Sequence, residues 1–107
     1  MGSLFVYGTL RPNQPNAHVL ERIGGTWQAG YILGHLEQRG WGAELGSPGI
    51  QLSDVGQRVE GYVFVSEYLE QYWAELDAFE GNEYQRTPVT VYLEDGKQFE
   101  SVVYALK

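Results

Sequence analysis

The chain has 107 residues, of which 43% are hydrophobic and 20% charged, a globular composition that fits a single domain spanning residues 1–107. Its net charge of −7 disfavours nucleic acid and anionic membranes as partners, and the lack of cysteine excludes disulfides, thiolate nucleophiles and cysteine-based metal sites. The first residues lack the basic and apolar regions of a signal peptide, and no segment approaches ~18 apolar residues, so we expect a cytoplasmic protein without a membrane span.

The first elements follow from a short apolar run and the turn residues behind it. Residues 4–7 predict a buried strand that ends at Gly8. Residues 8–15 are rich in glycine, proline and asparagine and predict a loop. Asn16 is a suitable cap for a short helix over residues 17–23, which two glycines end.

The middle of the chain has weaker signals. Residues 27–33 alternate imperfectly and indicate a strand, and residues 34–49 carry five glycines, which favours loops around one short strand at most. Trp41, among these glycines, is expected to wall a pocket or to shelter a dimer contact. Residues 58–65 predict a clear second strand.

A helix and a hairpin complete the chain. Ser66 is a plausible N-cap, and apolar residues at helical spacing predict an amphipathic helix over residues 67–79 that stops at Gly81. Asp95-Gly96 is a strong hairpin signal between strands at residues 87–93 and 98–106, and Pro88 must lie at a strand start or edge.

The order of these elements favours an α+β domain over a doubly wound sheet, because strands and helices do not alternate regularly. We expect a small mixed, barrel-like β-sheet with one main helix and one short helix.

The first motif with chemical potential is the turn that follows the first strand. A glycine there lets the backbone turn sharply, so that successive N–H groups point at one oxygen and form a nest for a carboxylate or an oxyanion. An ordinary strand-end turn remains the simpler reading. The residues of this motif are Tyr7, Gly8, Thr9, Leu10 and Arg11.

The second motif centres on Glu80, in the last turn of the main helix. The helix C-terminus, the neighbouring Asp77 and Glu83, and apolar residues such as Phe79 should all raise the pKa of a carboxyl and make it a better proton shuttle. A solvated glutamate is the alternative. Asp77 lies three residues before Glu80 and can touch it, although solvation of Asp77 is favoured.

Other residues carry weaker signals. His18 and His35 lie in different segments without ligand spacing, so no metal site is predicted. For Arg11 and Arg86, a structural ion pair is favoured over binding of a substrate carboxylate. Tyr84 is as well suited to orienting a substrate as to packing.

Together, Tyr7-Gly8-Thr9-Leu10-Arg11 and Leu76-Asp77-x-Phe79-Glu80-Gly81-x-x-Tyr84-x-Arg86 resemble the γ-glutamylcyclotransferase superfamily, and most of all its small AIG2-like and γ-glutamylaminecyclotransferase-like branch. Val59-Glu60-Gly61-Tyr62-Val63 and Ser101-Val102-Val103-Tyr104 are similar to two further strands of that family.

The resemblance implies a barrel-like α+β fold and a reaction without metal or cofactor. A small γ-glutamyl amine or amide would cyclise to 5-oxoproline and release an amine, with Glu80 as general base and then acid. Tyr7, Gly8, Thr9 and Leu10, together with Tyr84, would bind the substrate. A binding module with little turnover, or a structural partner protein, is the alternative. We expect a monomer or a weak homodimer.

Overall fold

The computed structural model describes residues 2–37 and 49–107. Its strands are β1 (Gly2–Val6), β2 (Thr26–Glu37), β3 (Gly49–Leu52), β4 (Gln57–Ser66), β5 (Tyr84–Leu93) and β6 (Gln98–Leu106). Its helical segments are α1 (His18–Glu21), the 3₁₀ helix η2 (Leu69–Tyr72) and α2 (Trp73–Glu80), which continues directly from η2.

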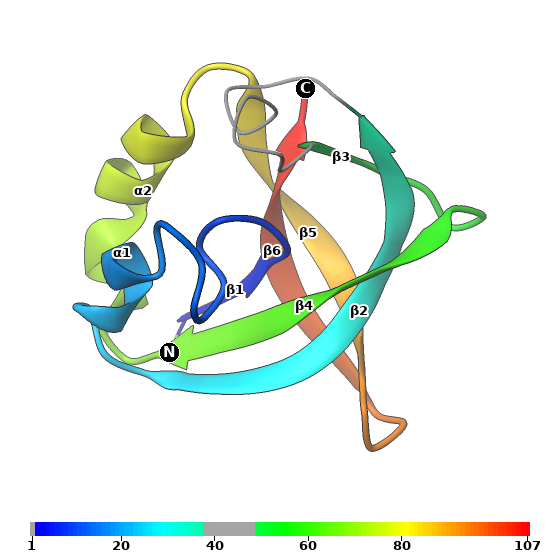
Figure 1. Cartoon of the computed structure of the whole chain (residues 1–107), viewed down its shortest axis with the longest axis horizontal. Helices are drawn as coiled ribbons and strands as arrows, with labels where there is room; N and C mark the ends of the chain where they lie inside the picture. The colour runs from blue at the N-terminus through cyan, green and yellow to red at the C-terminus, as the bar shows by residue number, and fades with distance from the viewer. Residues whose placement is uncertain (1, 38–48) are drawn as a thin grey trace.

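Five of these strands close into a barrel. The strand order is β3-β2-β4-β1-β6-β5, and a further pairing of β2 with β5 joins the two ends of the β2-β4-β1-β6-β5 segment. Strand β3 pairs with the end of β2 and stays outside this ring. All pairings are antiparallel except that of β1 with β6. The expected α+β class with a barrel-like sheet is therefore confirmed (Figure 1).

Close approach of β1 to β4 depends on a glycine. Gly61 of β4 pairs with Gly30 of β2, and a Cβ added at Gly61 would lie 2.1 Å from the carbonyl oxygen of Val6. No side chain fits at that distance, so the sequence needs glycine here for steric reasons. The end of β1 therefore lies close to β4, directly before the turn that begins at Tyr7.

The apolar residues form two cores that share β1. Because side chains alternate along a strand, Phe5 enters the barrel interior while Leu4 and Val6 face the helices. The barrel core consists of Phe5, Ile32, Ile50, Val59, Val63, Val91, Val103 and Ala105. The helix-side core consists of Leu4, Val6, Leu10, Val19, Leu20, Ile23, Phe64, Leu69, Leu76, Tyr84, Tyr104 and Leu106. This second core fixes α2 against the barrel, at the left in Figure 1.

Several predicted boundaries in the first half are wrong. The first helix covers only His18–Glu21, and the side chain of Asn16 does not cap it but donates from Nδ2 to Thr9 Oγ1 at 2.9 Å. The strand predicted at residues 27–33 runs over Thr26–Glu37, because it pairs along its length with β4, β5 and β3. Of the loops predicted at 34–49, residues 38–48 lie outside the described residues, and so does Trp41.

The second half agrees more closely with the sequence. The predicted helix begins as a 3₁₀ turn at Leu69, two residues later than expected, and Tyr68 is its N-cap residue. The prediction that Ser66 caps it is therefore wrong; the Ser66 hydroxyl lies at the end of β4, where it accepts the Tyr68 N–H at 3.1 Å. The hairpin forms as predicted, with β5 starting earlier, at Tyr84. Pro88 lies inside β5 where, among the described residues, the strand pairs only with β6, so the lack of an N–H disrupts no second ladder.

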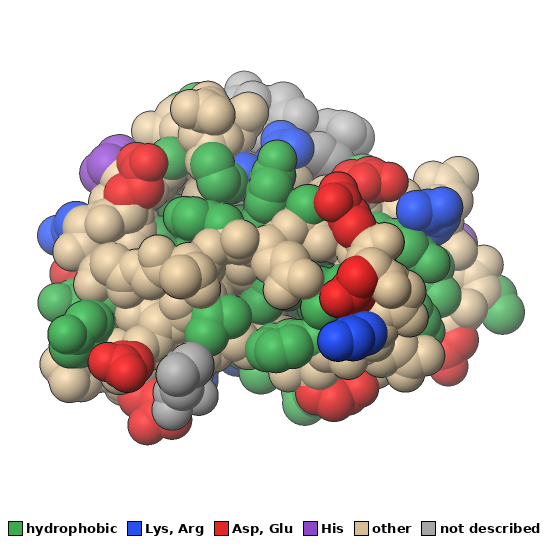
Figure 2. Space-filling view, turned by 90° about the horizontal axis from the view of Figure 1, so that it is seen from below, with side chains coloured by type: hydrophobic (Ala, Val, Ile, Leu, Met, Phe, Trp, Pro, Cys, Tyr) green, Lys and Arg blue, Asp and Glu red, His purple; other side chains and the backbone are tan. Residues whose placement is uncertain are grey.

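Acidic residues outnumber basic ones in this chain, by 14 to 7. Acidic side chains are more frequent than basic ones on the face shown in Figure 2, with hydrophobic groups exposed between them. This agrees with the net charge of −7. No helix of the described residues is long and apolar enough to cross a membrane.

Candidate active site

Glu80 is the last residue of α2, and the next residue turns the chain away. Gly81 has φ 89°, a conformation that favours glycine, and its N–H donates to the carbonyl of Asp77 at 3.0 Å. One turn earlier, Leu76 is 1% exposed and anchors the helix in the helix-side core. The backbone around Glu80 is thus held from both directions.

Burial raises the pKa of Glu80 from 4.5 to about 7. The sequence argument predicted this direction from desolvation, the helix terminus, Asp77 and Glu83 together. Desolvation is the cause that the structure supplies, and the charge of Asp77 is paired with Arg86 instead of being left to repel Glu80. A carboxyl that titrates near neutral pH can both accept and release a proton.

Tyr7, the first residue of the turn motif, is held by two hydrogen bonds. Its hydroxyl accepts the Ile50 N–H at 3.1 Å and donates to the Tyr104 carbonyl at 2.9 Å. Burial raises the pKa of Tyr7 well above its ordinary value; the Ile50 amide opposes this rise, and Tyr84 and Glu80 add to it.

The carbonyl groups of the following turn are held within the turn and loop. Arg11 donates to the Gly8 carbonyl from its backbone N–H at 3.2 Å and from Nε at 2.9 Å. The Asn16 N–H donates to the Thr9 carbonyl at 2.9 Å. Within the described part of the chain, the N–H groups of Gly8, Thr9 and Leu10 form no hydrogen bond to a backbone carbonyl. A nest binds an oxygen through N–H groups of this kind.

Two details of this turn differ from the sequence argument. The glycines with positive φ among residues 2–37 and 49–107 are Gly24, Gly81 and Gly96, so Gly8 turns the chain without a left-handed conformation. Arg11 forms no ion pair within these ranges and binds the carbonyl of Gly8 instead.

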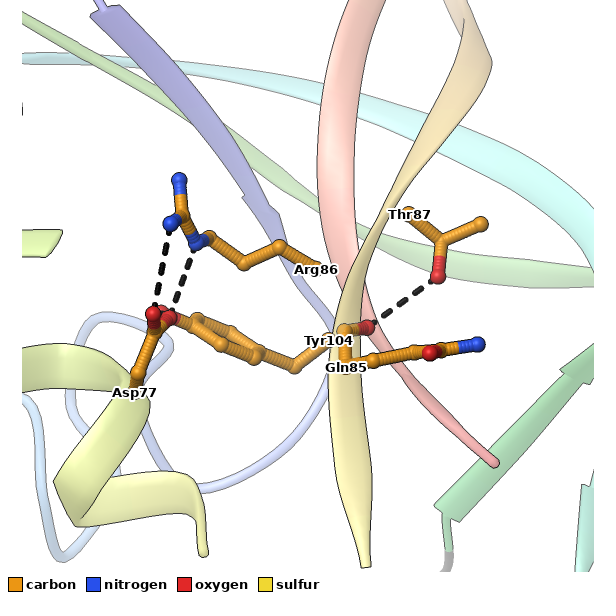
Figure 3. A network of polar contacts seen from close by, with 5 residues as sticks. All are labelled: Asp77, Gln85, Arg86, Thr87 and Tyr104. Atoms are coloured by element: carbon orange, nitrogen blue, oxygen red, sulfur yellow. Dashed lines mark hydrogen bonds and ion pairs between the residues drawn. The ribbon is translucent and has the colours of Figure 1, made fainter. Parts of the chain in front are cut away.

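Near Glu80 in sequence, Asp77 is exposed to solvent, as expected, and it also has two partners that the sequence did not indicate. Arg86 donates to its carboxylate from Nε at 2.8 Å and from Nη2 at 3.2 Å, and the Tyr104 hydroxyl donates to Oδ1 at 2.6 Å (Figure 3). Partial burial raises the pKa of Asp77, but these hydrogen bonds outweigh it and lower the pKa below its usual value. The predicted structural ion pair of Arg86 is confirmed.

An open cleft of about 640 Å³ lies at the end of α2. Its lining includes Asp77, Gly81, Tyr84, Arg86 and Tyr104. Tyr84 is 8% exposed and both packs in the helix-side core and borders this cleft, so the two roles considered for it are compatible.

The sequence argument placed Tyr104 in the last strand but did not identify it as a residue of the site. His18 lies on α1 and His35 on β2. No group of three or more histidine, aspartate or glutamate side chains suited to a metal ion occurs in the described ranges.

Comparisons with known proteins place this arrangement in a family. The family profile described as "Gamma-glutamyl cyclotransferase, AIG2-like" matches residues 4–107. The crystal structure of an AIG2-like protein from Mus musculus is 31% identical with a TM-score of 0.73, and the match covers 98% of this chain and 76% of that one.

Two further structures extend the comparison. The solution structure of an Arabidopsis thaliana protein is 26% identical with a TM-score of 0.71, covering 98% of this chain and 61% of that one. YkqA from Bacillus subtilis shares the fold at 24% identity and a TM-score of 0.73, and this chain spans only 36% of it. A search of curated proteins finds no match. The matching profile covers nearly the whole chain, which therefore belongs to the AIG2-like γ-glutamyl cyclotransferase family.

Proposed function

We propose that this protein cyclises a γ-glutamyl amine or amide to 5-oxoproline, releases the amine, and uses Glu80 as general base and acid. The observation that carries the proposal is the half-buried Glu80 carboxyl, whose pKa burial raises to about 7 and whose charge contributes to the raised pKa of Tyr7. Family membership supports the reaction class.

The first step activates the attacking nitrogen. Glu80 in its carboxylate form takes a proton from the substrate α-ammonium, and the nitrogen then bonds to the γ-carbonyl carbon. Because the attack is intramolecular, the site mainly has to hold the substrate in a folded shape. The N–H groups of Gly8, Thr9 and Leu10 are the donors proposed to bind oxygen atoms of the γ-glutamyl group.

The second step breaks the bond between the γ-carbon and the leaving nitrogen. Overall, two protons leave the α-nitrogen and two reach the released amine, and a carboxyl that gives up each proton before accepting the next can carry both in turn. A pKa near 7 suits this exchange, because neither form of Glu80 is strongly favoured at neutral pH. The cleft beside Gly81 and Tyr84 has the size of a small-molecule site, but neither Glu80 nor the Tyr7 turn lines it, so we assign it only as a path by which the amine leaves.

The test is a mass-spectrometric screen for 5-oxoproline with wild type and Glu80→Gln against a panel of γ-glutamyl amino acids and γ-glutamyl amines. We expect lactam from wild type and turnover lower by about 10² or more in the variant. Retention of most activity in Glu80→Gln would reject Glu80 as the shuttle.

The alternative is a binding module of the same fold with little turnover. It predicts no lactam from any compound in the panel, together with ligand binding that Glu80→Gln leaves unchanged. Calorimetric titration of both proteins with the same panel separates this outcome from an enzyme.

A further inference from the structure

Tyr104 forms hydrogen bonds with both segments of the proposed site, helix α2 and the turn that begins at Tyr7. Its hydroxyl donates to Asp77 Oδ1 at 2.6 Å, one helical turn before Glu80. Its carbonyl accepts the hydroxyl of Tyr7 at 2.9 Å. Tyr104 is 4% exposed and lies in β6, which also pairs with β1 through Val103 and Phe5.

The contact with Asp77 is well fixed from other directions. Arg86 of β5 binds the same carboxylate through two nitrogens, and its guanidinium carbon lies 4.5 Å from the ring centre of Trp73, at the start of α2. Asp77 and Arg86 are part-exposed, so their ion pair contributes little to stability by itself. The two hydrogen bonds from Arg86 fix the orientation of the Asp77 carboxylate as well as binding it.

We propose that Tyr104 is a positioning residue that sets the carboxyl of Glu80 relative to Tyr7 and its turn, by holding α2 through Asp77 and the turn through the hydroxyl of Tyr7. This inference rests on the proposed function for its kinetic consequence, but its structural content is independent of any substrate. Tyr104 itself need not touch the substrate.

Titratable groups around the end of α2 come from α2 itself and from the strands packed against it. Asp77 lies on its own helix, Tyr7 follows β1, Tyr84 begins β5, and Tyr104 lies on β6. Burial is the main cause of the raised pKa values of Tyr7 and Tyr104, and the charge of Glu80 adds a smaller contribution to each. A loosened helix end would admit water to Glu80 and remove part of the desolvation that raises its pKa.

The test compares Tyr104→Phe with wild type by NMR titration of the glutamate side-chain carboxyls, with Glu80→Gln used to assign the Glu80 signal. Tyr104→Phe keeps the ring and the carbonyl and removes only the hydroxyl. We expect the pKa of Glu80 to fall by about one unit. Where lactam formation is measurable, kcat should fall about tenfold with little change in KM, since positioning acts on the reacting geometry.

Two further variants complete the design. Thr90→Val removes a hydrogen bond of 2.9 Å to Glu100, also between β5 and β6 but outside the proposed site, and should leave the Glu80 titration unchanged. Asp77→Asn tests the same link from the helix and stands in if Tyr104→Phe does not fold. Because both variants act on one contact, Asp77→Asn combined with Tyr104→Phe should lower kcat by less than the product of the single effects.

The outcomes separate the two proposals. A Glu80 titration that is unchanged or moves upward in folded Tyr104→Phe would overturn the positioning role, whatever the activity. Absence of lactam from wild type would reject the proposed function, while a downward shift confined to Tyr104→Phe and Asp77→Asn would still support the positioning role.

Discussion

Replacing Glu80 by glutamine should stabilise the protein relative to wild type, and this difference in the free energy of unfolding should grow as the pH rises. The folded state raises the pKa of Glu80 from 4.5 to about 7, so between these values the folded protein binds more protons than the unfolded chain. The free energy of unfolding therefore falls as the pH increases through this window, and the full cost of ionising Glu80 is present above pH 7. Glutamine keeps nearly the same shape without this cost.

The size of the effect follows from the shift. Each pKa unit corresponds to ~1.4 kcal/mol, so ionisation of Glu80 in the folded state costs about 3 kcal/mol. At pH 8 we expect Glu80→Gln to be more stable than wild type by up to this amount, which for a domain of this size raises Tm by roughly 10 °C. At pH 4.5 the two proteins should differ little.

Urea unfolding of both proteins at pH 4.5, 5.5, 6.5 and 8 measures this difference directly. The exposed Glu70 of η2 offers a matched control, since Glu70→Gln changes the same charge at the surface. Parallel stability curves for wild type and Glu80→Gln across this range would show that Glu80 is not desolvated, and the reasoning from its burial would fail.

Three further predictions concern the reaction and the barrel. Below pH about 7, kcat/KM of wild type should fall about tenfold per pH unit, because protonated Glu80 cannot act as a base; a profile flat down to pH 5 would count against it. Gly8→Val should raise KM about tenfold by placing methyl groups over the turn amides, with an unchanged unfolding midpoint, and unaltered KM would locate binding elsewhere. Gly61→Ala should lower the free energy of unfolding by about 3 kcal/mol or prevent folding, because the added Cβ would clash with the carbonyl oxygen of Val6. Chemical denaturation measures this change.

Local sequence signals predicted the fold well where they were strong. The Asp95-Gly96 turn predicted the hairpin, and the strand expected over residues 98–106 has the observed bounds of β6. The length of β2 was not predictable, because its ends are set by pairing with three other strands and not by local alternation. Barrel closure through Gly30 and Leu93 is equally a long-range contact.

For the candidate site, sequence identified Glu80 and the Tyr7 turn as separate motifs, and in the structure the charge of Glu80 contributes to the raised pKa of Tyr7. The sequence predicted an ion pair for Arg86, but it identified neither Asp77 as the partner nor the hydrogen bond from Tyr104, because Arg86 and Tyr104 lie 9 and 27 positions from Asp77 along the chain. An aspartate on an exposed helix face gives no local sign that such partners will reach it.

The parallel pairing of β1 with β6 also has a consequence for the order of folding. Phe5 lies opposite Val103, so this contact closes a loop of nearly the whole chain. Contacts that are distant in sequence form late, because a large loss of chain entropy precedes any gain. The β5–β6 hairpin and the helices can form from neighbouring residues, whereas the turn after β1 gains its place beside Glu80 only when the barrel closes. Binding of a γ-glutamyl ligand should therefore appear in refolding experiments with the last kinetic phase.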